Sequence, residues 1–179
     1  KEIIIIDNNS TDGTVEVLNK IKKIKVIYQK KNLGAGRSIV TGIKKAKGEY
    51  VFIQFSDLEY DHTRSIDMLN YAIKNELDIV LGSRLKNKKS IYKLLIKKPA
   101  YLATLLTTFL INRLYKKNFT DIIGAKLYKT KTVKKIPVSS FHMGFDFEFI
   151  SRSCKRKLKM GEISIKYKPR TIAQGKKIR

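Results

Sequence analysis

Short strings of β-branched residues alternate with amphipathic segments along the first half of the chain. Residues 3–6 form an unbroken isoleucine run, which is typical of a strand that is covered on both faces of a sheet. Further strands are predicted at 26–28, 50–55 and 78–81. Three helices are predicted between them: residues 14–22 with Val15, Leu18 and Ile21 inward, a helix that opens at Gly34–Gly36 and ends at Gly48, and a helix capped by Thr63 that buries Ile66, Leu69 and Ile73. This alternation indicates βαβ units around a mostly parallel sheet.

The second half of the chain has a less regular pattern. Residues 90–117 contain an apolar helix with lysine-rich ends, and residues 145–152 form another helix. Strands are predicted at 125–128 and 163–167. No internal repeat or low-complexity linker divides the chain, so the sequence predicts a single α/β domain over residues 1–179.

Composition narrows the class of protein. The chain has 179 residues, and 39 Lys and Arg against 15 Asp and Glu leave a formal net charge of +24. Hydrophobic residues make up 42%, which excludes a disordered basic tail. The single cysteine excludes a disulfide framework. The longest apolar stretch, at 100–111, is shorter than the about 20 residues that a membrane span needs.

The high positive charge has two explanations that the sequence leaves open. A chain this rich in Lys, Ile and Asn has the composition expected of an AT-rich genome, which accounts for the basic residues without any ligand. The alternative is that the chain binds a polyanion, whether a membrane surface, nucleotide phosphates or nucleic acid.

Charged residues follow three of the predicted strands. Asp7 comes after the first strand, Asp57 and Glu59 after the third, and Arg84 after the fourth. Ligands of such sheets bind beyond the carboxyl ends of the strands, so these side chains should share one rim. Carboxylates at this spacing suit Mg²⁺ or Mn²⁺ shared with substrate phosphates. The alternative is that the acidic residues only cap turns and helices.

Several stretches of the sequence resemble a known protein family. They read IIIIDNNSTDGT at 3–14, NLGAGRSIVTGIKKAKGEYVFIQFSDLEYD at 32–61 and DIVLGSR at 78–84, and FTDIIGAKLYKT, HMGFDFEFISR and YKPRTIAQGKKI follow in matching order. Together they resemble family 2 glycosyltransferases, and in particular the dolichyl-phosphate mannose synthase-like subgroup. The resemblance implies a GT-A fold, which is a three-layer α/β/α sandwich with a mostly parallel, mixed central sheet. It also implies inverting transfer of a hexose from a GDP- or UDP-linked nucleotide sugar.

The resemblance assigns the nucleotide-sugar site to the first part of the chain. It implies that Asp7 accepts a hydrogen bond from the nucleobase. It also implies that Asn32 and Gly34 open a helix whose N-terminus, with Arg37, faces the diphosphate. The family's first strand has no counterpart here. We therefore expect residues 1–179 to be a catalytic domain that lacks this strand and its C-terminal end.

The metal motif departs from the family pattern. The family has Asp-x-Asp, whereas here the first Asp is replaced by Phe55, which cannot bind a metal. By the resemblance, Asp57 is catalytic, and Asp57 and Glu59 hold Mg²⁺ or Mn²⁺. Because Mg²⁺ often keeps only one or two protein carboxylates, we expect metal binding to survive. The alternative is a catalytically impaired homologue that still binds nucleotide sugars.

Basic residues are expected at the substrate phosphates. The resemblance places Arg84 at the acceptor phosphate, where a bidentate guanidinium suits the role, and it makes Arg84 a catalytic residue. It also places Arg170 and Lys176 in a segment that closes over the phosphates. The spacing between Asp121 and Gly124 is one residue shorter than the family pattern.

The sequence is compatible with two classes of acceptor. A sugar hydroxyl needs a carboxylate base, and Asp146 resembles the catalytic base of hydroxyl-acceptor members. A polyprenyl phosphate is already anionic and needs nearby positive charge instead. Basic residues flank the apolar stretch: Lys86, Lys88, Lys89, Lys93, Lys97, Lys98, Arg113, Lys116 and Lys117. The sequence therefore favours a polyprenyl phosphate acceptor, with Asp146 contacting a basic residue, and a saccharide hydroxyl is the alternative.

The same basic residues bear on where the protein works. A short apolar helix flanked by lysines can lie on an anionic membrane surface, or it can be an ordinary core helix. We expect a cytoplasmic protein that is peripheral at the inner face of the membrane. Nucleic acid is not an expected partner, because carboxylates at the strand ends would repel its phosphates.

Overall fold

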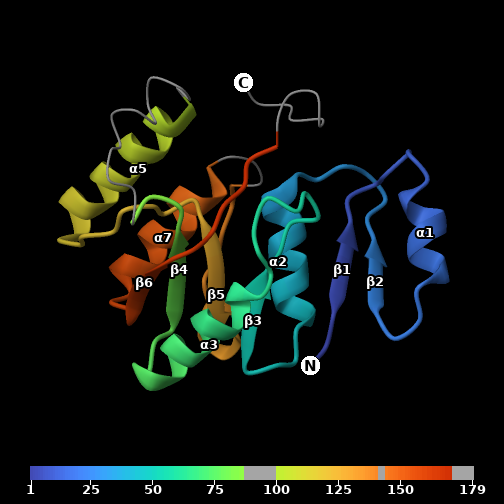
Figure 1. The fold of residues 1–179 in the computed structure, drawn as a ribbon, viewed down its shortest axis with the longest axis horizontal. Coiled ribbons are helices and arrows are strands. Elements are labelled where there is room, and N and C mark those ends of the chain that lie inside the picture. The colour runs from blue at the N-terminus through green and yellow to red at the C-terminus, as the bar shows by residue number, and fades with distance from the viewer. Residues whose placement is uncertain (87–99, 141–143, 171–179) are drawn as a thin grey trace.

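A computed structural model describes residues 1–86, 100–140 and 144–170 of the chain (Figure 1). Its elements, in chain order, are β1 (Ile4–Asp7), α1 (Thr14–Lys20), β2 (Lys25–Tyr28), α2 (Ala35–Lys45), β3 (Tyr50–Ile53), α3 (Arg64–Lys74), β4 (Ile79–Ser83), α5 (Ala100–Tyr115), β5 (Ala125–Lys129), α6 (Thr130–Val133), α7 (Phe145–Lys155) and β6 (Met160–Ser164). Strands and helices alternate from β1 to β4 as predicted, whereas the short helix α6 was not predicted. The last strand begins three residues earlier than the pattern indicated, and β3 ends at Ile53, which leaves Phe55 in a loop.

The strands form two sheets. One is the parallel pair β1–β2, and the other has the order β3-β5-β4-β6. In the second sheet β5 runs antiparallel to β3 and β4, whereas β6 runs parallel to β4. Strands β1 and β3 are not paired with each other. The expected mixed sheet is therefore present, and its antiparallel member is β5.

Helices cover both faces of the four-stranded sheet, which gives three layers (Figure 1). Residues alternate along β4, so that Ile79 and Leu81 pack on one face and Val80 packs on the other. The first face is covered by α2, α5, α6 and α7. The second face is covered by α3. Helix α2 also packs against β1, and it therefore joins the two sheets.

The predicted inward face of α3 is confirmed only in part, because Leu69 packs against the core but Ile66 and Ile73 do not. Ile66 and Ile73 are 63% and 58% exposed, whereas Met68 and Ala72 have no exposed surface. The connection that follows the helix fixes its rotation, because the Leu77 N–H donates to the Ala72 carbonyl at 2.9 Å and the Leu77 side chain is buried. Helix α1 also ends earlier than predicted, since its C-cap residue is already extended.

Helix α5 turns its more apolar side outward. Its inner face consists of Tyr101, Thr104, Thr108 and Ile111, all buried. Its outer face carries large exposed side chains: Leu102, Leu106, Phe109, Leu110 and Leu114. An ordinary core helix has the opposite arrangement. Among the described residues, no helix is both long and apolar enough to cross a membrane.

Candidate active site

The loops after β1 and β2 are joined by asparagine side chains. Asp7, the last residue of β1, is buried, and its carboxylate accepts the N–H of Ser10 at 3.1 Å. The next residue, Asn8, donates its side-chain amide to Asn32 Oδ1 at 2.8 Å. Asn8 also accepts the N–H of Leu33 at 2.9 Å. Asn8 therefore fixes the two loops to each other. It was not among the site residues predicted from the sequence.

Gly34 begins helix α2 in a conformation that only glycine adopts readily. Its φ is 81° and its ψ is 159°, and its N–H donates to Asn32 Oδ1 at 3.0 Å. The exposed Arg37 lies in the first turn that follows. Asn32, Gly34 and Arg37 are therefore brought together at one helix N-terminus, which carries partial positive charge.

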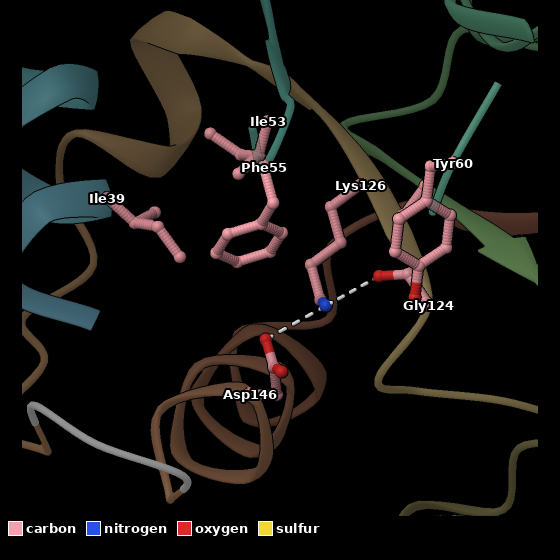
Figure 2. Close-up of a pocket in the computed structure, with 8 residues that line it drawn as sticks. Ile39, Ile53, Phe55, Tyr60, Gly124, Lys126 and Asp146 are labelled. Carbon is pink, nitrogen blue, oxygen red and sulfur yellow. Dashed lines mark hydrogen bonds and ion pairs between the residues drawn. The ribbon is translucent and has the colours of Figure 1, made fainter. Parts of the chain in front are cut away.

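A pocket opens beside Phe55, at the end of β3. Figure 2 shows the Phe55 ring between Ile39 and the Lys126 side chain. The residues that line the pocket are Ile39, Ile53, Phe55, Tyr60, Gly124, Ala125, Lys126 and Asp146. Phe55 is 43% exposed, so it borders the pocket without being buried in the core. The position of the missing motif carboxylate is thus occupied by an aromatic ring at the edge of this pocket.

An ion pair lies in the wall of the pocket. Lys126 Nζ is 2.9 Å from Asp146 Oδ1 and donates to the carbonyl of Gly124 at 2.8 Å (Figure 2). It also donates to the carbonyl of Ile123 at 3.1 Å. An ammonium group has three protons, so these contacts use all of them. Asp146 therefore contacts a basic residue through one of its carboxylate oxygens.

Asp57 and Glu59 differ in what they offer to a metal. Asp57 is partly exposed, and one carboxylate oxygen accepts the Glu59 N–H at 3.1 Å. No other described residue bonds this carboxylate, so Asp57 fits a single-carboxylate site for Mg²⁺ or Mn²⁺. Glu59 is 8% exposed, and both of its carboxylate oxygens accept hydrogen bonds from the chain. In this arrangement Glu59 does not fit as a second ligand.

Arg84 is built into the fold. Its guanidinium binds Asp121 through Nε at 2.7 Å and Nη2 at 3.0 Å, and its backbone N–H donates to the same carboxylate. The rings of Tyr101 and Tyr167 flank it at 5.2 Å and 5.3 Å. Burial by itself would lower the pKa of Arg84, but the Asp121 carboxylate more than offsets this and raises it above its ordinary value.

Three residues that hold the loops of the candidate site together were not identified from the sequence. Asp121, whose spacing from Gly124 is one residue shorter than in the family pattern, has no exposed surface and binds Arg84. Glu162 is buried in β6 and accepts the N–H groups of Thr120 and Asp121. Tyr167 donates to Glu59. Glu162 lies one residue before the strand predicted at 163–167, so the sequence did not place its carboxylate within a strand.

The expected phosphate-binding segment is only partly described. Arg170 follows Tyr167, and its N–H donates to Glu59 Oε1 at 3.0 Å. Arg170 Nε lies 3.5 Å from the same oxygen, which is an ion-pair distance. Lys176 lies outside the described residues.

Comparison with known proteins places this site in a family. The profile described as "Glycosyl transferase family 2" matches residues 1–137. A dolichyl-phosphate beta-glucosyltransferase of Dictyostelium discoideum is 28% identical over 93% of this chain and 54% of that protein. A poly(ribitol-phosphate) beta-N-acetylglucosaminyltransferase of Staphylococcus aureus is 41% identical over 45% of this chain and 26% of that protein. The chain thus spans about a quarter to about half of the length of these relatives.

Solved structures agree on the fold. A complex of glucosyl-3-phosphoglycerate synthase from Mycobacterium tuberculosis with Mn²⁺, UDP-glucose and phosphoglyceric acid has a TM-score of 0.61 and 14% identity, over 97% of this chain and 63% of that chain. Staphylococcus aureus TarS in complex with UDP has a TM-score of 0.60 and 16% identity, over 93% and 49%. These likenesses confirm the predicted GT-A fold class. Because the family profile covers residues 1–137 of the 179, the chain belongs to glycosyl transferase family 2.

Proposed function

We propose that the chain is the catalytic part of a glycosyltransferase that moves a hexose from a nucleotide sugar to a polyprenyl phosphate with inversion. The observation that carries this choice of acceptor is the ion pair between Asp146 and Lys126 at 2.9 Å. A hydroxyl acceptor needs a carboxylate base, and one oxygen of Asp146 is engaged by Lys126, whereas a phosphate oxygen attacks without a base. The Dictyostelium relative, a dolichyl-phosphate glucosyltransferase by name, supports the same acceptor class.

The donor would bind along the loops that follow β1, β2 and β3. Asp7 would accept a hydrogen bond from the nucleobase, and Asn32 and Gly34 would shape the helix start beside the diphosphate. Arg37 and Arg170 would neutralise its charge, together with Lys176. Asp57 would hold Mg²⁺ or Mn²⁺, and such an ion supplies stabilisation of the departing diphosphate. Mycobacterial and staphylococcal proteins of this fold were solved with Mn²⁺ and UDP-glucose and with UDP, which supports a nucleotide sugar as donor.

The role proposed for Arg84 differs from binding of the acceptor phosphate, which is the role that the resemblance implied. Its guanidinium is bound bidentately to the buried Asp121. We therefore assign it to holding the loop after β4 on the acceptor side, since a guanidinium engaged in this way is less available to a ligand.

A membrane surface would supply the lipid acceptor. The outer face of α5 exposes Leu102, Leu106 and Phe109 at 61%, 57% and 61%. Arg113 and Lys116 are exposed at the C-terminal end of the same helix. Apolar side chains beside cations suit an interface of anionic lipids, where the apolar groups enter the acyl boundary and the cations meet headgroups. This supports an anionic bilayer as the partner of α5.

Replacing Asp146 by Asn tests the acceptor. Sugar transfer from radiolabelled UDP- and GDP-hexoses to polyprenyl phosphate is measured with Mn²⁺ affinity and the unfolding midpoint. Loss of a general base costs about 100-fold or more, so a lipid-phosphate enzyme should keep turnover within about tenfold. Glu148→Gln, which removes a carboxylate from the same helix outside the pocket, is the matched control.

Two results of this experiment would contradict the proposal. Near-complete loss of turnover with Mn²⁺ binding and folding intact would favour a saccharide hydroxyl acceptor with Asp146 as base. Absence of transfer from every donor by the unmodified protein would favour a catalytically impaired homologue. The observation that motivates this alternative is the replacement of a motif carboxylate by Phe55.

A further inference from the structure

The segment after β6, residues 165–170, is held against two loops of the candidate site. We call it the C-terminal strap. The Ile165 N–H donates to the Ser83 carbonyl at 2.9 Å, at the end of β4. The Tyr167 ring lies 5.0 Å from the Tyr60 ring, and these two residues also form an isolated antiparallel β-bridge. The strap therefore crosses from the loop after β4 to the loop after β3.

Most of the strap's polar contacts with the loop after β3 are made with Glu59. The Glu59 carbonyl accepts the Lys168 N–H at 2.9 Å. One carboxylate oxygen accepts the Tyr167 hydroxyl at 2.5 Å, and the other accepts the Arg170 N–H at 3.0 Å. Burial raises the pKa of the Tyr167 hydroxyl, and its bond to the Glu59 carboxylate raises it further. The hydroxyl therefore stays protonated and keeps donating to Glu59 at neutral pH.

Glu59 also links the strap to both sides of the candidate site. On one side, its N–H donates to Asp57 Oδ1 at 3.1 Å. On the other side, Tyr167 brings its ring to 5.3 Å from the Arg84 guanidinium. A displacement of Glu59 would thus move the Asp57 loop, the strap and the aromatic cover of Arg84 together.

We infer that Glu59 is a positioning residue that seats the C-terminal strap and presents Arg170 to the nucleotide diphosphate, and that it is not a metal ligand. Ligation of a metal by Glu59 would require its oxygens to leave Tyr167 and Arg170. The hydrogen bonds that Tyr167 and Arg170 donate to the Glu59 carboxylate are charge-assisted and lie in a buried setting, where such bonds are strong. The part of the inference that concerns the diphosphate rests on the proposed function, whereas the seating of the strap does not.

The test uses Tyr167→Phe and Glu59→Gln in the intact protein, with Asp57→Asn as the comparison. Tyr167→Phe keeps every carboxylate and the aromatic ring, and it removes only the hydroxyl bond to Glu59. Three quantities are measured: hydrogen exchange of the Lys168 and Arg170 amides, affinity for Mn²⁺ alone, and affinity for UDP and GDP in the presence of Mn²⁺. The unfolding midpoint is followed as well, since a merely structural role lowers it without changing the nucleotide affinity of the folded protein.

Tyr167→Phe should speed exchange of both amides by about tenfold, because those amides are protected by the seated strap. It should also weaken nucleotide affinity several-fold and leave Mn²⁺ affinity unchanged. Glu59→Gln should give the same pattern. A loss of Mn²⁺ affinity in Glu59→Gln as large as in Asp57→Asn would overturn the inference, and so would unchanged exchange in Tyr167→Phe. Unchanged Mn²⁺ affinity in Asp57→Asn would contradict only the proposed function.

Discussion

Arg84 and Asp121 form a bidentate ion pair in which the carboxylate has no surface exposed to solvent. One Asp121 oxygen accepts the Arg84 Nε at 2.7 Å, and the other also accepts the N–H groups of Ile123 and Gly124 at 3.0 Å and 3.1 Å. Gly124 passes close to the Gly82 carbonyl, since a Cβ there would lie 2.0 Å from that oxygen. The pair therefore fastens the end of β4 to the loop that leads into β5.

Replacing Asp121 by Asn should destabilise the protein strongly. The substitution keeps the shape of the side chain and leaves the Arg84 charge buried without a counter-ion, a change that costs about 3 kcal/mol or more. Denaturant unfolding at neutral pH measures the free energy. Asp67→Asn is the control, because the Arg64–Asp67 pair is 37% and 50% exposed and such pairs contribute about 0–1 kcal/mol. Equal effects of the two substitutions would contradict the structural role given to Asp121.

Gly34 at the N-cap of α2 and Gly42 within the helix should respond in opposite directions to replacement by Ala. Gly34→Ala forces a side chain into the glycine-only region at φ 81° and should cost about 1–3 kcal/mol. Gly42→Ala should stabilise by up to about 1 kcal/mol, because a Cβ there meets Ile6 at an ordinary 3.6 Å and Ala is the better helix former. Denaturant unfolding measures both, and affinity for UDP and GDP should fall only in Gly34→Ala. Destabilisation by both variants to the same extent would contradict this account.

Phe55→Asp restores the first carboxylate of the metal motif. A second carboxylate beside Asp57 should raise the affinity for Mn²⁺ by about tenfold, because ligand charge governs the binding of hard cations. Phe55→Leu, which changes the ring without adding a carboxylate, should leave Mn²⁺ affinity unchanged. Calorimetry measures the affinities, and sugar transfer is assayed in parallel. Transfer that occurs only in Phe55→Asp would show that the unmodified site is impaired and would contradict the proposed function.

Local pattern was enough to predict the strands and helices, but it could not predict contacts between distant segments. The isoleucine run at 3–6 and the glycine-opened helix α2 follow from nearest neighbours in the sequence, and both are present. Tyr167 and Glu59 are 108 positions apart, and no periodicity links them. The antiparallel direction of β5 could not be predicted for the same reason, because it depends on pairing with strands that are distant in the sequence. The prediction for α3 failed at Ile66 and Ile73 because the connection to β4 turns Met68 and Ala72 towards the sheet instead.

The exposed face of α5 should bind anionic vesicles. Leu106→Ser together with Phe109→Ser removes two side chains that are 57% and 61% exposed, and each buried side chain of this size contributes about 1.5–3 kcal/mol. Affinity for vesicles that contain phosphatidylglycerol should therefore fall by at least about tenfold. Val17→Ser is the control, because Val17 is 60% exposed on α1, at the opposite end of the molecule from α5 (Figure 1).

Vesicle flotation distinguishes an anionic bilayer from a second copy of the chain as the partner of the exposed face of α5. Binding should be weak to neutral phosphatidylcholine vesicles and should decline with salt, because Arg113 and Lys116 act through screened charge. If the unmodified protein does not float with anionic vesicles, the membrane assignment is wrong. Self-association that disappears in the double variant would assign the same face to a second copy of the chain.

Glu148 should make the stability of the fold depend on pH in the acidic range. Its carboxylate accepts the N–H of Ser139 and Ser140 at 3.1 Å and 2.7 Å and lies 2.8 Å from Arg152 Nε. Burial raises the pKa of Glu148, but the hydrogen bonds from Ser140 and Ser139 outweigh it and bring the pKa to about 2. A carboxyl with a depressed folded pKa stabilises the fold above its ordinary value of 4.5 and loses that contribution as the pH falls towards 2.

Glu148→Gln should accordingly lower the free energy of unfolding at neutral pH by about 1.5 kcal/mol, the contribution of hydrogen bonds to a charged group. The difference between the variant and the unmodified protein should stay constant down to about pH 5. It should then shrink as the pH falls towards 2, because the unfolded chain binds a proton at this carboxyl before the native protein does. Glu76→Gln is the control, because Glu76 is 82% exposed in its pair with Lys159 and should show little difference at any pH. A Glu148→Gln difference that grows on acidification has the wrong sign for a depressed pKa and would assign the hydrogen bonds of Ser139 and Ser140 to the neutral carboxyl.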